Sequence, residues 1–469
     1  MTIRLSGLLL VALLGGCASV DIDESIQHTN EQAADFTGGQ LQLAQTDDQR
    51  STMQARADEL LADPLGQDEA VRVALINSPR MQMLIAQYWS EAAEAAENGR
   101  IANPVFAFER IRLGGELEIA RALSFGLVDV LTYPQRYSRA QRALASAQLG
   151  LTATVVEEVT EVRQAWVEAV GASERLEYAY QVFESAEASA ELAQRMRAAG
   201  NFSELARARQ QVFYSDAVTR LASARHQAIA AREALVQRLG LTEEQADRLV
   251  LPKRLPDIPQ APVQANTLEN EALQKRLDVQ IAKAGFEAAA EAQGLTLLTS
   301  FTDIEVAALR ETVFEDGDRE SAWGYEFELT LPIFNWGGMQ REAMNARTLA
   351  AANSLEATLR SIGSDLREQY SAYRTAYDVA RHYRTEVIPL RQKIMEESVL
   401  RYNGMIIGVF ELLADHRQQV ASVIGAIDAT QNFWLADAAL EATLIGRPTN
   451  LNTSLSIESN PAGGGDEAH

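Results

Sequence analysis

The chain has 469 residues, which is enough for a large core or for more than one structural unit. Acidic residues (65) outnumber basic residues (42), and the formal net charge at pH 7 is -23. This charge argues against a nucleic-acid partner, because no basic patch could offset it. It is compatible with a periplasmic protein or with a channel that attracts cations, and its simplest role is to keep a large helical surface soluble.

Residues 1–16 are typical of a bacterial lipoprotein signal peptide. Arg4 supplies a positive charge, and the apolar stretch 8–14 is too short to span a bilayer. Small residues precede Cys17, the only cysteine of the chain, so an internal disulfide is excluded. We predict cleavage before Cys17, a covalent lipid on its sulfur and no other cofactor; the alternative is an ordinary signal peptide. Ala18 resembles the second residue of lipoproteins that are sorted to the outer membrane.

Residues 17–66 are polar and lack a sustained hydrophobic period, so we predict a lipidated, mostly extended tether. A first structural unit is predicted at 67–250. An amphipathic helix starts near Asp68, breaks at Asn77-Ser78-Pro79 and continues to Asn98-Gly99. The break suits a new helix start, because proline is favoured in the first turn of a helix.

A β-hairpin is predicted next, with strands at 105–113 and 117–133 joined by Gly114-Gly115. Arg121 interrupts the apolar face of its second strand. A helix from 135 to 199 follows, and at 1.5 Å per residue it is roughly 95 Å long, too long for a compact domain. The turn at 200–205 ends this helix, and a shorter helix runs to residue 240.

A proline-rich linker is predicted at 251–266, and the same order of elements then starts again in a second unit at 267–447. We predict a helix at 267–292, strands at 295–309 and 322–334, a long helix at 338–402 and a shorter helix that ends at 446. The tail 448–469 is predicted to be disordered.

The stretch 323–331 alternates apolar and polar residues, which is typical of a strand with one apolar face. Pro332, Gly337 and Gly338 then break the strand before the long helix. The segments 200–205 and 408–413 have similar sequences, so the two units are an internal duplication offset by roughly 205 residues. The fold class is therefore mainly α with a small β part, built from long antiparallel helical hairpins and two β-hairpins.

Two hairpins supply about four strands, and membrane β-barrels start at about eight. Either the strands never enter a membrane, or several chains combine them into one barrel; three chains would supply twelve.

The duplicated pattern resembles the TolC family of outer-membrane efflux proteins, in lipoprotein form, over about residues 67–447. The resemblance rests on the stretches 68–79, 331–338, 195–205 and 402–413. It implies a homotrimer with a twelve-stranded β-barrel in outer-membrane lipid and a long periplasmic α-helical tunnel. It also implies a periplasmic adaptor (membrane fusion) protein and an inner-membrane RND-type pump or ABC transporter as partners, and thus a channel for efflux or type I secretion.

The resemblance also implies functional residues at the periplasmic end of the helices. The turns that would dock the adaptor contain Gly200, Asn201, Phe202, Gly404, Gly408 and Phe410. Acidic residues beyond the second turn would narrow the channel aperture. Glu411 falls at such a position and Asp415 lies one helical turn farther on, so both are predicted aperture residues, whereas Ala414 stands where the family has an acidic residue. The alternative for Glu411 is a solvated residue at a helix N-terminus.

No enzyme and no metal site are predicted. The five histidines show no metal-ligand spacing, and no nucleophile lies in a recognisable motif. Met395 and Met405 could favour soft cations, but methionines at helical spacing more often pack in a core. The alternative to a channel is a lipid-anchored periplasmic coiled-coil scaffold whose hairpins pack on its own helices.

Overall fold

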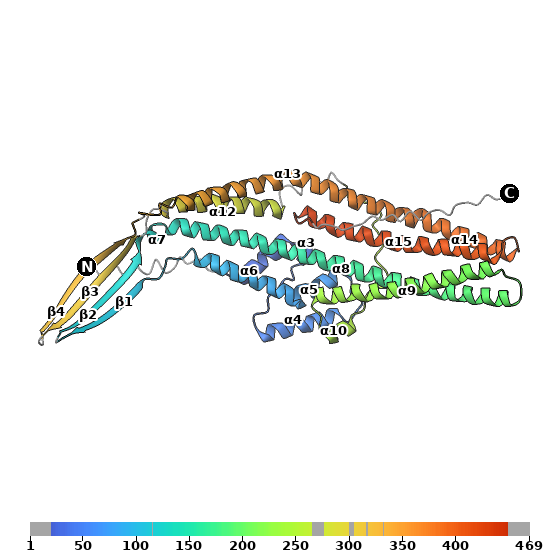
Figure 1. The fold of residues 1–469 in the computed structure, drawn as a ribbon, viewed down its shortest axis with the longest axis horizontal. Coiled ribbons are helices and arrows are strands. Elements are labelled where there is room, and N and C mark those ends of the chain that lie inside the picture. The colour runs from blue at the N-terminus through green and yellow to red at the C-terminus, as the bar shows by residue number, and fades with distance from the viewer. Residues whose placement is uncertain are drawn as a thin grey trace.

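The computed structural model describes residues 20–114, 116–264, 276–299, 304–315, 318–331 and 333–448. These residues form an elongated molecule with a β-sheet at one end and the tips of two helical hairpins at the other (Figure 1). The predicted signal peptide, Cys17, Gly115, Pro332, the start of the predicted helix 267–292 (residues 267–275) and residues 449–469 of the C-terminal tail lie outside the described residues. Among the helices described, none combines the length and the apolar character needed to cross a membrane.

The N-terminal segment corrects one prediction, because residues 22–60 are largely helical. Its helices are α2 (Ile22–Gln32), α3 (Ala34–Thr37) and α4 (Asp47–Leu60). Asp21 caps α2 by accepting hydrogen bonds from two backbone N–H groups, and Thr46 forms a capping box with Gln49. Ile22 and Phe36 are buried in the main core. The extended tether is therefore wrong for this segment: few apolar residues suffice when their spacing places them on one face.

The first repeat contains two short helices, a hairpin, a very long helix and its return helix. Their bounds are α5 (Gln67–Asn77), α6 (Pro79–Glu97), β1 (Val105–Leu113), β2 (Glu116–Gly126), α7 (Leu127–Leu131), α8 (Tyr133–Ala198), α9 (Glu204–Leu239) and α10 (Glu243–Arg248). The first strand and the long helix confirm the predictions. The second strand is shorter than predicted, because residues 127–131 form α7.

The second repeat has the same order of elements. Its bounds are α12 (Leu277–Thr299), β3 (Ile304–Glu315), β4 (Asp318–Leu329), α13 (Gly338–His382), the π-helical turn η2 (Tyr383–Val387), α14 (Ile388–Asn403) and α15 (Val409–Leu444). The predicted strand start at 295 and helix end at 292 are wrong, because α12 continues to residue 299. The predicted strand 322–334 is shifted: β4 begins at residue 318 and ends at residue 329.

The π-helical turn lies where Pro389 enters the long helix of the second repeat. Proline has no N–H to donate to the carbonyl of Thr385, which an α-helix would require at this point. The helix axis nevertheless continues from α13 into α14, so the predicted long helix at 338–402 is confirmed as one rod (Figure 1).

In each repeat the end of the last long helix is joined to the start of an early helix, and a glycine lies at this junction. The side-chain amide of Asn77 donates to the carbonyl of Gly240 (3.0 Å), and the guanidinium of Arg276 donates to the carbonyl of Thr443 (2.9 Å). Gly240 and Gly446 both have a positive φ (66° and 89°). A Cβ on either glycine would lie within 3 Å of the neighbouring helix start. The two junctions are equivalent, which confirms the duplication.

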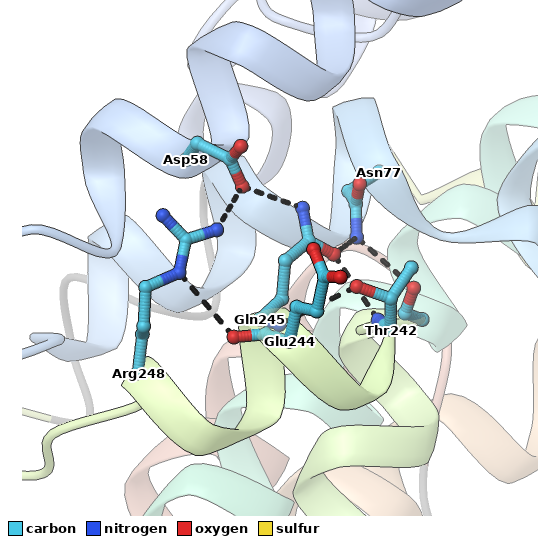
Figure 2. A network of polar contacts seen from close by, with 7 residues as sticks. Asp58, Asn77, Thr242, Glu244, Gln245 and Arg248 are labelled. Carbon is cyan, nitrogen blue, oxygen red and sulfur yellow. Dashed lines mark hydrogen bonds and ion pairs between the residues drawn. The ribbon is translucent and has the colours of Figure 1, made fainter.

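A polar network joins the N-terminal segment to the first repeat (Figure 2). Gln245 donates to Asp58 (2.8 Å) and accepts from Asn77 (3.3 Å). Arg248 also donates to Asp58 (3.0 Å). This network fixes α4 against α5 and α10.

The proline-rich linker lies across α13 and is held there by tyrosines. The hydroxyl of Tyr377 donates to the carbonyl of Gln260 (2.9 Å), and the hydroxyl of Tyr373 accepts from the N–H of Val263 (3.1 Å). Both tyrosine side chains are buried. The linker is therefore a fixed part of the second repeat rather than a free connection.

Candidate functional site

The two turns that were predicted to dock an adaptor lie together at the end of the molecule opposite the sheet (Figure 1). The rings of Phe202 and Phe410 are stacked, with centroids 4.4 Å apart and an interplanar angle of 29°. Phe202 is buried, although it belongs to a surface turn. This contact between the first and second repeats was not predicted, since the sequence only shows that both turns contain a phenylalanine.

The first turn is a regular helix end and helix start. Gly200 has φ +79°, a conformation that favours glycine at a helix C-terminus. The hydroxyl of Ser203 caps α9 by accepting from the N–H of Ala206 (3.1 Å). The guanidinium of Arg197 donates to the carbonyl of Phe202 (3.2 Å) and so ties the turn to α8.

The second turn exposes apolar side chains. Met405 has φ +58°, and among the described residues no other non-glycine residue has a positive φ. Its side chain is 93 % exposed, and that of Ile406 is 74 % exposed. Gly408 follows in an extended conformation and precedes α15. An exposed methionine and isoleucine at a strained turn give the tip an apolar surface available for a partner.

A groove of about 700 Å³ lies behind the stacked phenylalanines, between α9 and α15. The guanidinium of Arg417 lies over the ring of Phe213, 5.2 Å from its centroid. The side-chain carbonyl of Gln210 is buried and has no hydrogen-bond partner among the described residues. The groove walls include Leu205, Val212, Phe213, Phe410, Glu411 and Arg417.

The two predicted aperture residues have different surroundings. Glu411 is exposed in the first turn of α15 and lines the groove. Asp415 is half-buried and accepts a hydrogen bond from the hydroxyl of Ser398 on α14, so it contributes to the contact between two helices. His416 is also half-buried, and burial lowers its pKa from the ordinary value. Within the described part of the chain, no group of His, Cys, Asp and Glu could hold a metal ion.

The predicted break between the last strand and the long helix of the second repeat has a glycine, Gly337, at the helix N-cap. Gly337 has φ +69° at the N-terminus of α13, and its N–H donates to the side chain of Asn335 (3.0 Å). The guanidinium of Arg341 donates to the carbonyl of Trp336 (2.7 Å) and holds the same turn. Gly338 is the first residue of the helix.

The sheet is antiparallel, in the order β1-β2-β3-β4, and projects beyond the helices (Figure 1). The predicted alternation in β4 is confirmed: Trp323, Tyr325 and Phe327 are on one face, with exposed fractions of 86 %, 72 % and 64 %. The strand register places Phe106 and Phe108 of β1 on this same face. We call it the aromatic face.

Charged residues are completely sorted between the two faces of the sheet. Because residues that are directly opposite across a ladder share a face, the register assigns each charged residue of the four strands to one face. The arginines all belong to the aromatic face: Arg110, Arg112, Arg121, Arg310 and Arg319. The carboxylates all belong to the other face, which we call the acidic face: Glu109, Glu116, Glu118, Glu305, Glu311, Glu315, Asp318, Glu320, Glu326 and Glu328.

The two outer strands each have an unpaired edge. Within the described residues, β1 pairs only with β2, and β4 pairs only with β3. Such edges present free N–H and C=O groups to another strand.

Comparison with known proteins identifies the fold. No family model and no curated protein matches the chain. Solved structures do match. A membrane protein from Pseudomonas aeruginosa is 21 % identical, with a TM-score of 0.64 over 81 % of this chain and 93 % of that one. The outer membrane protein VceC of Vibrio cholerae is 15 % identical, with a TM-score of 0.65 over 84 % and 97 %. The MtrE outer membrane channel of Neisseria gonorrhoeae is 18 % identical, with a TM-score of 0.58 over 84 % and 91 %.

The chain has the fold of an outer membrane channel protein. The match extends over most of this chain and of each of these structures. The predicted fold class, mainly helical with a small antiparallel sheet in a duplicated arrangement, is confirmed.

Proposed function

We propose that the protein is the outer-membrane channel component of a tripartite efflux or type I secretion system. In this proposal it lies in the bacterial outer membrane, with its helices in the periplasm, and it conducts substrate without catalysing a reaction. The observation that carries the proposal is the four-stranded sheet, which projects from the helices with an exposed aromatic face and two unpaired edges.

The unpaired edges support a homotrimer. In lipid each unpaired backbone group costs several kcal/mol, so a four-stranded sheet is not stable there alone. If β4 of one chain pairs with β1 of the next, three chains close a barrel of twelve strands and no edge remains. The aromatic face then contacts lipid, and the acidic face lines a polar channel that favours cations.

The position of α2 supports a lipid anchor at Cys17. The backbone carbonyl of Ser25 accepts from the side chain of Gln148 (2.9 Å), and the hydroxyls of Thr29 and Thr152 are 3.3 Å apart. Helix α2 therefore runs alongside α8 and starts roughly 18 Å from the sheet end of α8 at 1.5 Å per residue. The five residues back to Cys17 span up to roughly 17 Å when extended, so a lipid there would reach the membrane at the base of the sheet.

The tip supports docking of a periplasmic adaptor that connects to an inner-membrane RND-type pump or ABC transporter. Met405 and Ile406 expose apolar surface at the extreme end, and the stacked Phe202 and Phe410 hold the two turns in one fixed arrangement. Glu411 is exposed beside this surface, where it is available to narrow an aperture. Asp415 supports the aperture indirectly, through its hydrogen bond to α14.

The alternative, a lipid-anchored scaffold, needs hairpins that pack on the helices of the same chain. The helix α7 contacts β3 at the base of the sheet, but the aromatic face beyond it is exposed. This exposure favours the channel.

Recordings from purified protein in a planar lipid bilayer test the proposal. We expect discrete conductance steps with a preference for cations, and we expect Phe327→Asp to abolish them, because a charge on the lipid-facing side opposes insertion. Phe327→Leu is the matched control and keeps the conductance. A wild-type protein that remains folded and yields no conductance contradicts the channel.

A further inference from the structure

The arginines of the aromatic face form a band across the four strands. Arg121 lies directly opposite Arg310 on the two central strands, in a row with Phe108 and Trp323 of the outer strands. Arg110 lies one row farther from the helices, and Arg112 and Arg319 lie in the row beyond that. We call Arg110, Arg112, Arg121, Arg310 and Arg319 the arginine band.

The band begins where the apolar surface of the sheet ends. Toward the helices, the rows of the aromatic face contain Tyr325, Phe327 and Leu329 on β4, with Phe125 and Leu123 on β2. Toward the turns, every row contains at least one arginine. A charge on the lipid-facing side of a barrel is unfavourable in the hydrocarbon and tolerated at the interface. The boundary between these rows therefore marks the outer edge of the hydrocarbon.

The band has no counter-ion of its own. None of its members forms an ion pair within the described residues, and all carboxylates of the sheet are on the acidic face. Arg121 and Arg310 are like charges directly opposite each other, an unfavourable arrangement in an isolated sheet. Arg319 has an aromatic neighbour instead, the ring of Phe314 at 5.9 Å from its guanidinium carbon. In a chain with an excess of acidic residues, this sorting leaves a positive surface for an external anion.

We propose that the arginine band binds the phosphate groups of the anionic glycolipid that forms the outer leaflet of the outer membrane, lipid A and its polysaccharide conjugates. The inference rests on the proposed function, since it requires the aromatic face to contact lipid. Guanidinium groups bind phosphate through paired hydrogen bonds, and several of them at one level match headgroups that lie at one level. In a closed trimer the band would surround the barrel at the surface of the outer leaflet.

The test measures binding of lipid A to the purified full-length protein in neutral detergent. The variant is R110Q/R121Q/R310Q, which removes three charges of the band; Arg110 and Arg310 are exposed and Arg121 is half-buried. The control is R220Q/R225Q/R401Q, which removes three exposed arginines from the helices. We expect the wild type and the control to bind bisphosphorylated lipid A equally, and the variant to bind it at least tenfold more weakly. We expect R110K/R121K/R310K to bind with intermediate affinity, because lysine keeps the charge and loses the paired geometry.

Two further arms identify the source of the phosphate. We expect the wild type to bind dephosphorylated lipid A weakly, with the affinity that the variant has for bisphosphorylated lipid A. We expect inorganic phosphate alone not to saturate the band. Equal binding by wild type and variant, equal binding of dephosphorylated lipid A, or saturation by inorganic phosphate would each overturn the proposal. Bilayer conductance of the same preparations is read in parallel. If the wild type conducts but does not bind lipid A more tightly than the variant does, the proposal for the arginine band is wrong and the proposed function stands. If the wild type does not conduct, the proposed function is wrong.

Discussion

Arg276 is fully buried, and its charge is balanced by close partners. Its guanidinium donates to the carboxylate of Asp278 (2.6 and 3.0 Å) and to the carbonyl of Thr443 (2.9 Å). Removing one partner of a buried ion pair leaves the other uncompensated, which costs about 3–5 kcal/mol. The side chain thus fixes the start of α12 to the end of α15.

We expect Arg276→Ala to lower the free energy of unfolding by about 3–5 kcal/mol, measured by urea denaturation in detergent. The control is Arg360→Ala, which breaks an exposed pair with Glu356 one helical turn away. Such pairs contribute about 0.5 kcal/mol or less. Equal effects of the two substitutions would show that Arg276 is not a structural anchor.

Asp437 gives the protein a pH-dependent stability. Burial raises its pKa from 3.8 to about 7; Glu441 adds to the increase, and Arg163 opposes it. The folded state binds the proton more tightly than the unfolded state, so the free energy of unfolding falls as the pH rises from about 4 to about 7. Above about pH 7 the carboxyl group is ionised in both the folded and the unfolded state, so its contribution to the free energy of unfolding no longer changes with pH.

We therefore expect Asp437→Asn to stabilise the protein at pH 8 by at most about 4 kcal/mol and to have no effect near pH 4. Urea denaturation of wild type and variant at both pH values measures the difference. A difference of the same size at pH 4 and pH 8 would rule out titration of this carboxyl group as the cause.

At the scale of elements, the linker between the repeats depends on the tyrosines of α13. Tyr377 and Tyr373 bind its backbone at Gln260 and Val263, and each such hydrogen bond contributes about 1 kcal/mol. The linker also contains Lys253 and Arg254, which are exposed and form a trypsin site. Local opening of the linker is thus measurable separately from unfolding of the whole chain.

We expect Tyr373→Phe combined with Tyr377→Phe to accelerate trypsin cleavage after residues 253 and 254 several-fold under native conditions. The substitution keeps both buried rings and removes only the hydroxyls. Tyr180→Phe, an exposed position on α8, is the control and should leave the cleavage rate unchanged. If the double variant is cleaved at the wild-type rate, the tyrosine hydroxyls do not hold the linker.

At the scale of the whole molecule, periodicity and duplication predicted most of the fold. The long helices have strong start and stop signals, such as Gly200 and Ser203, and the alternation in β4 is regular. The sequence predicted both tip turns, but not the Phe202–Phe410 stack, because a contact between repeats has no local signal.

The remaining features were not predicted, because they depend on contacts between residues that are far apart in the sequence or on few buried residues. The N-terminal helices were missed because α2 has only three buried residues and α4 only two, so polar residues dominate both segments. Arg121 was read as an interruption of an apolar face. The register shows that it belongs to a band, because Arg310 is directly opposite it. The signal was present in the sequence, because within each strand the acidic residues and the arginines are separated by odd numbers of positions, which places them on opposite faces.

Closure of the sheet by several copies of the chain is the central feature of the proposed channel. The measurement that tests it is the mass of the particle extracted from the membrane in detergent, corrected for bound detergent. We expect three chains per particle, the number that the resemblance to the TolC family implies; their twelve strands would close into one barrel with no edge unpaired. A stable particle of one chain would contradict the proposed channel, since it would leave the edges of β1 and β4 open.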